Sequence, residues 1–211
     1  MKKPTLYHYW RSSSSWRVRW ALTLKKIDVN FEHVNLLDDS TNTPVHRALN
    51  PMGFVPVLNV EGKNLIESVA IIEWLEEKYP MPSLFPGDSF QKQHIRSLVE
   101  IINAGIQPVQ NLTVLDHYSQ DADKRKAWSQ HFIRNGFKAY EKLIENSAGK
   151  YSVGNQITAA DLFLIPQCYN SLRQEIDLKN EFPKIYQIYE TAMKTPEAKA
   201  SAPDSFSPEK G

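Results

Sequence analysis

The sequence predicts an α/β domain followed by an all-helical domain, and three observations support this fold class. The first eighty residues alternate short strand and helix signals. Prolines and a glycine then crowd a short stretch, and the rest of the chain shows only helical periodicity. A chain of 211 residues, 41% hydrophobic and 23% charged, is long enough for one large core or two smaller ones.

The first domain reads as a βαβ unit followed by a ββα unit. The first strand leads into a helix that carries Val18 and Leu22 on one face. Two later strands turn at Glu61-Gly62, which predicts a hairpin. The expected elements are strands at 5–9, 31–35, 55–60 and 64–66, helices at 15–26 and 69–78, and a short irregular or helical piece at 43–49.

The domain boundary is marked by the proline- and glycine-rich stretch between residues 80 and 89. We expect a first domain at 1–82, a linker at 83–89 and a second domain at 90–211. The tail from Ser201 holds several prolines and serines, so we expect it to be mobile or to lie along the surface. Helices are expected at 90–117 with a kink at Pro108, and at 123–147, 158–172 and 182–194.

Charge and cysteine content argue against several classes of function. The 25 basic residues nearly balance the 24 acidic ones, so nothing in the charge favours a nucleic-acid or membrane partner. Cys168 is the only cysteine, which argues against disulfides and favours the reducing cytoplasm. The start lacks the apolar run of a signal peptide, and no later stretch approaches bilayer length. Scattered histidines and eight glycines form no metal-binding or nucleotide-binding motif.

A hydroxyl cluster, Ser12 to Ser15, lies at the start of the first predicted helix. The first N–H groups of a helix have no internal partner and sit at the positive end of its dipole. Together with nearby hydroxyls they can stabilise a thiolate, a phosphate or a carboxylate. The alternative is that these serines act only as N-caps and loop formers.

Three further patterns have a functional and a structural interpretation. Val55-Pro56 lies at the start of a predicted strand. A cis bond there would leave backbone groups free to pair with a peptide. The alternative is a trans bond, with a proline that only prevents further strands from pairing at this edge. Glu67-Ser68 precedes a helix and suits the head group of an amino acid, and the alternative, favoured when the pattern is taken by itself, is that Ser68 is a plain N-cap. Thr158 and Asp161 form a capping-box pattern, which we interpret as structural.

Taken together, these motifs resemble the cytosolic glutathione transferases across essentially the whole chain. The run Ser12-Ser13-Ser14-Ser15-Trp16-Arg17-Val18-Arg19 resembles the zeta-class signature Ser-Ser-Cys-Ser-Trp-Arg-Val-Arg. Other segments similar to that class are Leu49-Asn50-Pro51-Met52 through Val55-Pro56, Gly105-Ile106-Gln107-Pro108 and Gln110-Asn111-Leu112. The resemblance implies a thioredoxin-like first domain that binds glutathione, a helical domain lining the other wall of the site, and a homodimer.

The resemblance also assigns roles to individual residues. Ser12 would hydrogen-bond the glutathione sulfur and favour its thiolate, with Ser13 as a second donor and Ser14 beside them in the catalytic set. Arg11 and Arg173 would bind the carboxylates of a dicarboxylic substrate. The residues implied to bind glutathione are Ser12, Ser13, Val55, Pro56, Glu67, Ser68, Gln107, Asn111, Leu112 and Thr113.

Some positions depart from the family pattern or have a weaker assignment. Ser14 replaces the family cysteine, which puts side activities such as conjugation in doubt before isomerisation. Trp20 stands where the family has a smaller residue, and we interpret it as core packing. Arg17 and Arg19 are weaker candidates for substrate binding, because most helix arginines are solvated or in surface ion pairs.

The activity implied is glutathione-dependent cis–trans isomerisation of maleylacetoacetate in phenylalanine and tyrosine breakdown. In that chemistry the glutathione thiolate adds to a cis double bond, the new single bond rotates, and elimination releases a trans product. Three alternatives remain open: isomerisation of maleylpyruvate, general conjugation with α-haloacid or peroxide substrates, and a binding module without catalysis.

Overall fold

The computed structural model describes residues 2–208, and their contacts divide the chain into two compact units. The first unit combines residues up to Ser83 with the segment from Pro196, and the second spans Leu84–Thr195. The sequence analysis had assigned the segment after residue 195 to the helical domain, whereas its contacts in the structure are with the first unit. Residues 209–211 of the predicted tail lie outside the described residues.

The first unit contains a four-stranded mixed sheet with strand order β2-β1-β3-β4. β1 pairs in parallel with β2 and antiparallel with β3, and β3 pairs antiparallel with β4. Glu61 and Gly62 both have positive φ, as a two-residue hairpin turn requires, and they confirm the predicted hairpin. The strands are β1 (Thr5–His8), β2 (Asn30–His33), β3 (Val57–Val60) and β4 (Lys63–Ile66).

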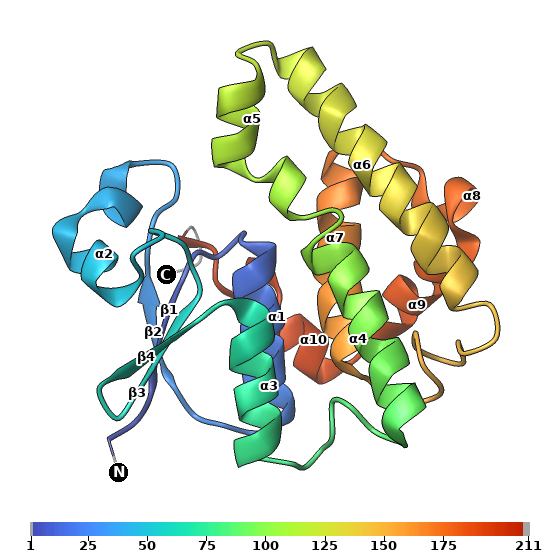
Figure 1. Cartoon of the computed structure of the whole chain (residues 1–211), viewed down its shortest axis with the longest axis horizontal. Helices are drawn as coiled ribbons and strands as arrows, with labels where there is room; N and C mark the ends of the chain where they lie inside the picture. The colour runs from blue at the N-terminus through green and yellow to red at the C-terminus, as the bar shows by residue number, and fades with distance from the viewer. Residues whose placement is uncertain (1, 209–211) are drawn as a thin grey trace. The chain divides into compact units, whose positions relative to one another are not determined.

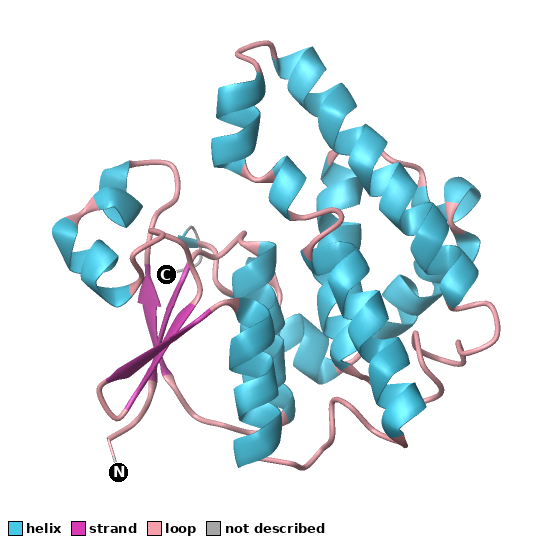
Figure 2. Cartoon of the chain, in the orientation of Figure 1, coloured by secondary structure: helices cyan, strands magenta, loops and turns pink. Residues whose placement is uncertain are grey.

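Two helices of the first unit, α1 (Ser13–Leu24) and α3 (Ser68–Lys78), lie side by side next to the sheet, and α2 lies apart from them (Figure 1). Figure 2 shows the strands in magenta and the helices around them in cyan. The α/β character predicted for this part of the chain is confirmed. The other helical elements of the unit are η1 (Asp39–Asn42), α2 (Pro44–Leu49), α10 (Pro196–Ser201) and η3 (Pro203–Ser205).

The expected mobile or superficial tail is wrong for its first three residues, 201–203, whereas Asp204, Ser205 and Pro208 are exposed, as expected. Ser201 is fully buried, and Ala202 and Pro203 are buried as well. The hydroxyl of Ser201 accepts a hydrogen bond from the indole of Trp16, and its carbonyl accepts one from Arg19. Proline and serine content alone therefore misjudged this segment, because its partners lie more than 180 positions earlier in the chain.

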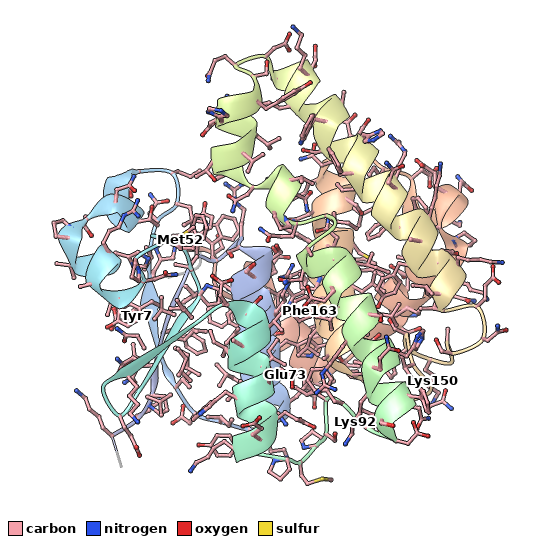
Figure 3. All side chains as sticks on the ribbon, viewed as in Figure 1. Tyr7, Met52, Glu73, Lys92, Lys150 and Phe163 are labelled. Atoms are coloured by element: carbon pink, nitrogen blue, oxygen red, sulfur yellow. The ribbon has the colours of Figure 1, made fainter. Side chains whose placement is uncertain are left out.

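The second unit is helical, as predicted. α7 is its central helix: ten consecutive residues from Ala159 to Cys168 are buried, and Figure 3 labels one of them, Phe163. A helix that is buried on all sides must be covered by other helices, and α4 and α9 pack against it. The elements are α4 (Ser89–Asn103), η2 (Pro108–Gln110), α5 (Leu112–Tyr118), α6 (Ala122–Leu143), α7 (Ala159–Arg173), α8 (Leu178–Glu181) and α9 (Pro183–Ala192).

The continuous kinked helix expected at 90–117 is wrong. α4 ends at Asn103, and the chain turns before η2 begins at Pro108. Proline has no N–H to continue a helix but suits the first position of a new one, so the chain starts again there. The helix expected at 182–194 is confirmed as α9, with Pro183 as its first residue, and the short helix α8 before it was not predicted.

The capping box at the start of α7 is confirmed. One carboxylate oxygen of Asp161 accepts from the backbone N–H of Thr158 at 2.8 Å, and the other accepts from Ser152 N–H at 2.8 Å. Burial raises the pKa of Asp161, and these hydrogen bonds oppose the shift. The motif therefore stabilises the entry to the buried helix, as the sequence analysis interpreted it.

Candidate functional site

The predicted site residues fall in both units. In the first unit the serine cluster begins α1 two residues earlier than expected, with Ser12 as its N-cap. Ser12 Oγ accepts a hydrogen bond of 3.1 Å from the backbone N–H of Ser15. A hydroxyl oxygen that accepts in this way still has its own proton to donate. Capping the helix and donating to a sulfur are thus compatible roles for Ser12.

The other serines of the cluster differ in exposure. Ser13 and Ser15 are buried, whereas Ser12 and Ser14 are half-buried. Ser14, which stands in place of the family cysteine, is the second residue of α1 and so sits within its first turn. Ser12 and Ser14 are therefore the two hydroxyls of the cluster that are more accessible to a ligand.

Arg11 lies beside the cluster on two aromatic rings. Its Nη2 donates to the hydroxyl of Tyr9 at 3.3 Å, and its guanidinium carbon lies 4.9 Å from the Trp10 ring centroid. Such stacking restricts the guanidinium while leaving donors available for a carboxylate.

Val55 packs in the same hydrophobic cluster as Tyr9, the residue whose hydroxyl Arg11 contacts. Its side chain is buried and belongs to one cluster with Tyr9 and Val34, against which Trp10 packs. The Val55-Pro56 peptide bond is cis, which decides between the two alternatives left open by the sequence. The β3 ladder begins at Val57, so Val55 precedes the paired strand.

Glu67 and Ser68 lie at the start of α3. Glu67 occupies the N-cap position with a φ of +66°, a region that non-glycine residues adopt rarely and that often marks a functional site. Its side chain makes no capping hydrogen bond. Ser68 is the first helical residue, so the alternative interpretation of Ser68 as a plain N-cap is wrong.

Ser68 instead contacts α1. Its hydroxyl accepts a hydrogen bond of 3.1 Å from Nη1 of Arg17, which is 1% exposed. This bond links the second turn of α1 to the first turn of α3, and so joins the helix that Ser12 caps to the Glu67-Ser68 region. The expectation of a solvated Arg17 is wrong, since α3 and α10 pack against α1 and the Arg17 side chain is buried.

Arg19 is also buried rather than solvated. Its guanidinium donates to the carbonyls of Tyr9, Trp10 and Ser201 and lies 3.2 Å from Nδ1 of His8. Burial lowers the pKa of Arg19 to about 9, so it remains charged at neutral pH. Because a charged guanidinium can only donate, His8 Nδ1 accepts, and His8 is neutral. Burial and Arg19 together lower the pKa of His8 to about 3.

The predicted residues of the second unit follow its interrupted helix. Gln107 precedes η2 and is half-buried, Asn111 is the N-cap of α5, and Leu112 and Thr113 begin that helix and are exposed. Arg173 is the last residue of α7 and is exposed.

Two anchors that the sequence analysis missed hold η2 in place. Gln110 Nε2 donates to the buried side chain of Gln167 at 2.6 Å, and the indole of Trp128 donates to the carbonyl of Val109 at 2.8 Å. No local pattern could reveal them, since the partners come from α6 and α7.

Within residues 2–208, no group of three or more metal-ligating side chains is found, and no helix there is long and apolar enough to span a membrane. The first unit thus has a mixed four-stranded sheet and two helices, α1 and α3, joined by the Arg17–Ser68 hydrogen bond, and a helical unit follows it in the chain. Family models identify the class of protein that has these two domains. The family model described as glutathione S-transferase, N-terminal domain, matches residues 6–83, and that for the C-terminal domain matches residues 108–200. The chain therefore belongs to the glutathione S-transferase family.

Its relatives within the family carry more particular names. The chain is 43% identical over 205 residues to "Probable maleylacetoacetate isomerase 2" of Drosophila melanogaster, covering 96% of this chain and 89% of the relative. It matches the holo structure of a bacterial zeta-class maleyl pyruvate isomerase with a TM-score of 0.93 and 35% identity, covering 97% and 99% of the two chains.

A third similar protein is the maleylacetoacetate isomerase of Anaeromyxobacter dehalogenans. Its structure with bound GSH in the active site matches with a TM-score of 0.88 and 38% identity, covering 98% of this chain and 97% of that one. Its structure with bound dicarboxyethyl glutathione and citrate matches with a TM-score of 0.87 and 36% identity, covering 99% of each.

Proposed function

We propose that this protein is a zeta-class glutathione transferase that isomerises maleylacetoacetate to fumarylacetoacetate with glutathione as cofactor. The observation that carries the proposal is the pair of helix N-termini in the first unit: α1 with the Ser12 hydroxyl, and α3 without a side-chain cap. Both can hold anionic groups. The names of relatives at about 40% identity support the choice of reaction.

The residues of the first unit fit glutathione chemically. The uncapped N–H groups of α3 and the Ser68 hydroxyl suit the carboxylate of its γ-glutamyl group, and Glu67 suits the amino group. Val55, which precedes the β3 ladder, suits the backbone of its cysteinyl residue. When bound, glutathione supplies a thiolate nucleophile for reversible addition to a cis double bond.

The protein's contribution at the sulfur comes from Ser12 and α1. A hydroxyl donor at the positive end of a helix favours the thiolate over the thiol. Ser13 is buried as the first residue of α1, and we assign it a supporting role. Arg11 would hold one carboxylate of the substrate through its free donors, because the Tyr9 and Trp10 rings already limit its motion.

The test compares Ser12→Ala with Ser12→Thr in the isomerisation of maleylacetone, a stable stand-in for the substrate, with and without glutathione. Losing one donor to the reacting sulfur should lower turnover by about a hundredfold. Since Ser12→Ala also removes an N-cap worth about 1 kcal/mol, Asp121→Ala, which removes the cap of α6, controls for that loss. Ser12→Thr should retain most activity. Turnover unchanged in Ser12→Ala would contradict the assignment.

The second candidate substrate is maleylpyruvate, favoured by the similarity to the bacterial maleyl pyruvate isomerase. Both substrates are acyl diacids that differ by a short segment, a difference worth about 1–3 kcal/mol in discrimination. Competition between maleylacetone and maleylpyruvate separates the two. Activity on α-haloacids or peroxides alone would indicate a conjugating transferase, and glutathione binding without turnover would indicate a binding module.

We further propose that the protein acts in the cytoplasm as a homodimer. Residues 37–52, which include η1 and α2, expose three large apolar side chains, Leu37, Val45 and Met52, and Met52 is labelled in Figure 3. Exposed apolar side chains of this kind favour association. Light scattering of the purified chain would measure the mass and test the dimer.

A further inference from the structure

Arg17 is a buried charge next to a residue of the proposed glutathione site. Its side chain is 1% exposed, and one of its partners is the hydroxyl of Ser68, 3.1 Å from Nη1. Burying a guanidinium costs free energy that hydrogen bonds must offset. A leucine or methionine at this position of α1 would fill the same space without that cost. The position of the charge therefore calls for an explanation.

The Ser68 hydroxyl shows what the charge can do. A guanidinium can only donate, so the Ser68 oxygen is the acceptor in its hydrogen bond with Arg17. The hydroxyl proton of Ser68 is therefore directed to another acceptor. Ser68 is the first residue of α3 and does not cap it. Its hydroxyl thus lies in the first turn, where the N–H groups of the helix carry partial positive charge.

We propose that Arg17 is a positioning residue for glutathione, one that holds the Ser68 hydroxyl oriented to donate to the α-carboxylate of the γ-glutamyl group. Arg17 acts through Ser68 and does not touch the ligand. It also places a positive charge one hydrogen bond behind the carboxylate, in a poorly solvated region where charge interactions are stronger. The inference rests on the proposed function, because it needs glutathione as the ligand.

The contact of Arg17 is with the γ-glutamyl end of the proposed site. Arg17 sits on the second turn of α1, whose N-cap is Ser12, and reaches the first residue of α3. A change at Arg17 would therefore shift the recognition of the γ-glutamyl head more than the reactivity of the sulfur. That difference separates positioning from a general structural role.

The experiment measures glutathione binding by calorimetry to the full chain and to Arg17→Met, Ser68→Ala and the double variant. The second ligand is γ-aminobutyryl-cysteinyl-glycine, which is glutathione without the α-carboxylate of its first residue. The wild type should prefer glutathione over this analogue. Arg17→Met should reduce the preference about tenfold, the effect of one hydrogen bond to a charged group. In the Ser68→Ala background, Arg17→Met should change it little.

Two further variants keep the test informative. Arg17→Lys retains the charge and should keep part of the preference even if Arg17→Met folds poorly. Arg134→Met makes the same chemical change in the ion pair of Arg134 with Glu181 in the second unit, and it should leave both affinities unchanged.

Three results would overturn the inference. They are an equal weakening of both ligands by Arg17→Met, a loss of the preference in Arg17→Lys as complete as in Arg17→Met, and an effect of Arg17→Met that persists in the Ser68→Ala background. A wild type that fails to bind glutathione at millimolar concentration would instead contradict the proposed function itself, so the two failures are distinguishable.

Discussion

The indole Nε1 of Trp16 donates a hydrogen bond of 3.1 Å to the hydroxyl oxygen of Ser201, a residue 185 positions later in the chain. Arg19, one turn further along α1, donates to the carbonyl of the same serine and lies 4.7 Å from the ring centroid of Phe206. The segment from Pro196 is therefore a structural part of the first unit. It covers the side of α1 that carries the tryptophan and the second arginine of the signature.

Replacing Ser201 with alanine should destabilise the fold. The change removes the acceptor of a buried indole N–H, and an unsatisfied buried donor costs about 1–3 kcal/mol. Ser205→Ala is the matched control, because its exposed hydroxyl donates only to a nearby carbonyl of Lys199 and should matter by about 0.5 kcal/mol or less. Urea unfolding measures both. Equal effects of the two variants would show that the Trp16 contact contributes little.

The stability of the protein should depend on pH through His8. Its folded-state pKa of about 3 lies below the unfolded value of 6.5, so the folded state binds fewer protons between these values. The stabilisation is complete above pH 6.5 and is lost as the pH falls through this window, by about 2 kcal/mol between pH 6.5 and 5. In His8→Gln, the amide oxygen still accepts from Arg19 but does not titrate. If the free energy of unfolding of the wild type and of His8→Gln changed with pH in the same way, His8 would not be the cause of the pH dependence.

Lys25 should contribute more to stability than an exposed lysine. Its ammonium group donates to Glu76 at 2.8 Å and to the carbonyls of Tyr79 and Pro82, so all three of its donors have acceptors. Lys25→Met removes one partner of a buried ion pair and should cost about 3 kcal/mol. The control is Lys3→Met, which breaks the exposed pair with Asp28 and should cost less than about 1 kcal/mol. Thermal unfolding of the two variants makes the comparison.

Ser14→Cys should change the balance between the proposed reactions. A thiol in the first turn of α1 would have a lowered pKa, because the helix N-terminus favours the thiolate. We expect the rate of conjugation of an α-haloacid to rise relative to the rate of isomerisation of maleylacetone. Ser13→Cys puts the same thiol at a buried neighbouring position and should shift the ratio less. A ratio unaffected by Ser14→Cys would contradict a part for a thiol at position 14 in conjugation by this protein.

The sequence predicted well those features whose causes lie within a few residues. The hairpin at Glu61-Gly62 needs only two residues that accept positive φ, and the capping box of α7 needs only Thr158 and Asp161. The serine cluster likewise indicated a helix start, although the helix begins at Ser13 rather than Ser15. Proline marked interruptions correctly but not their extent, since Pro108 opens a new element instead of bending an old one.

The sequence alone determined the order of strands and helices in the first eighty residues, the hairpin, the capping box of α7 and the family resemblance, because each depends on local backbone preferences or on short motifs. Only the tertiary structure decided that Arg17, Arg19 and His8 are buried and that the segment after residue 195 belongs to the first unit. Arg17 meets Ser68 from 51 positions away, and Arg19 meets Ser201 from 182. Whether a polar side chain is buried or exposed depends on which distant segments cover it, and helical periodicity carries no information about those segments.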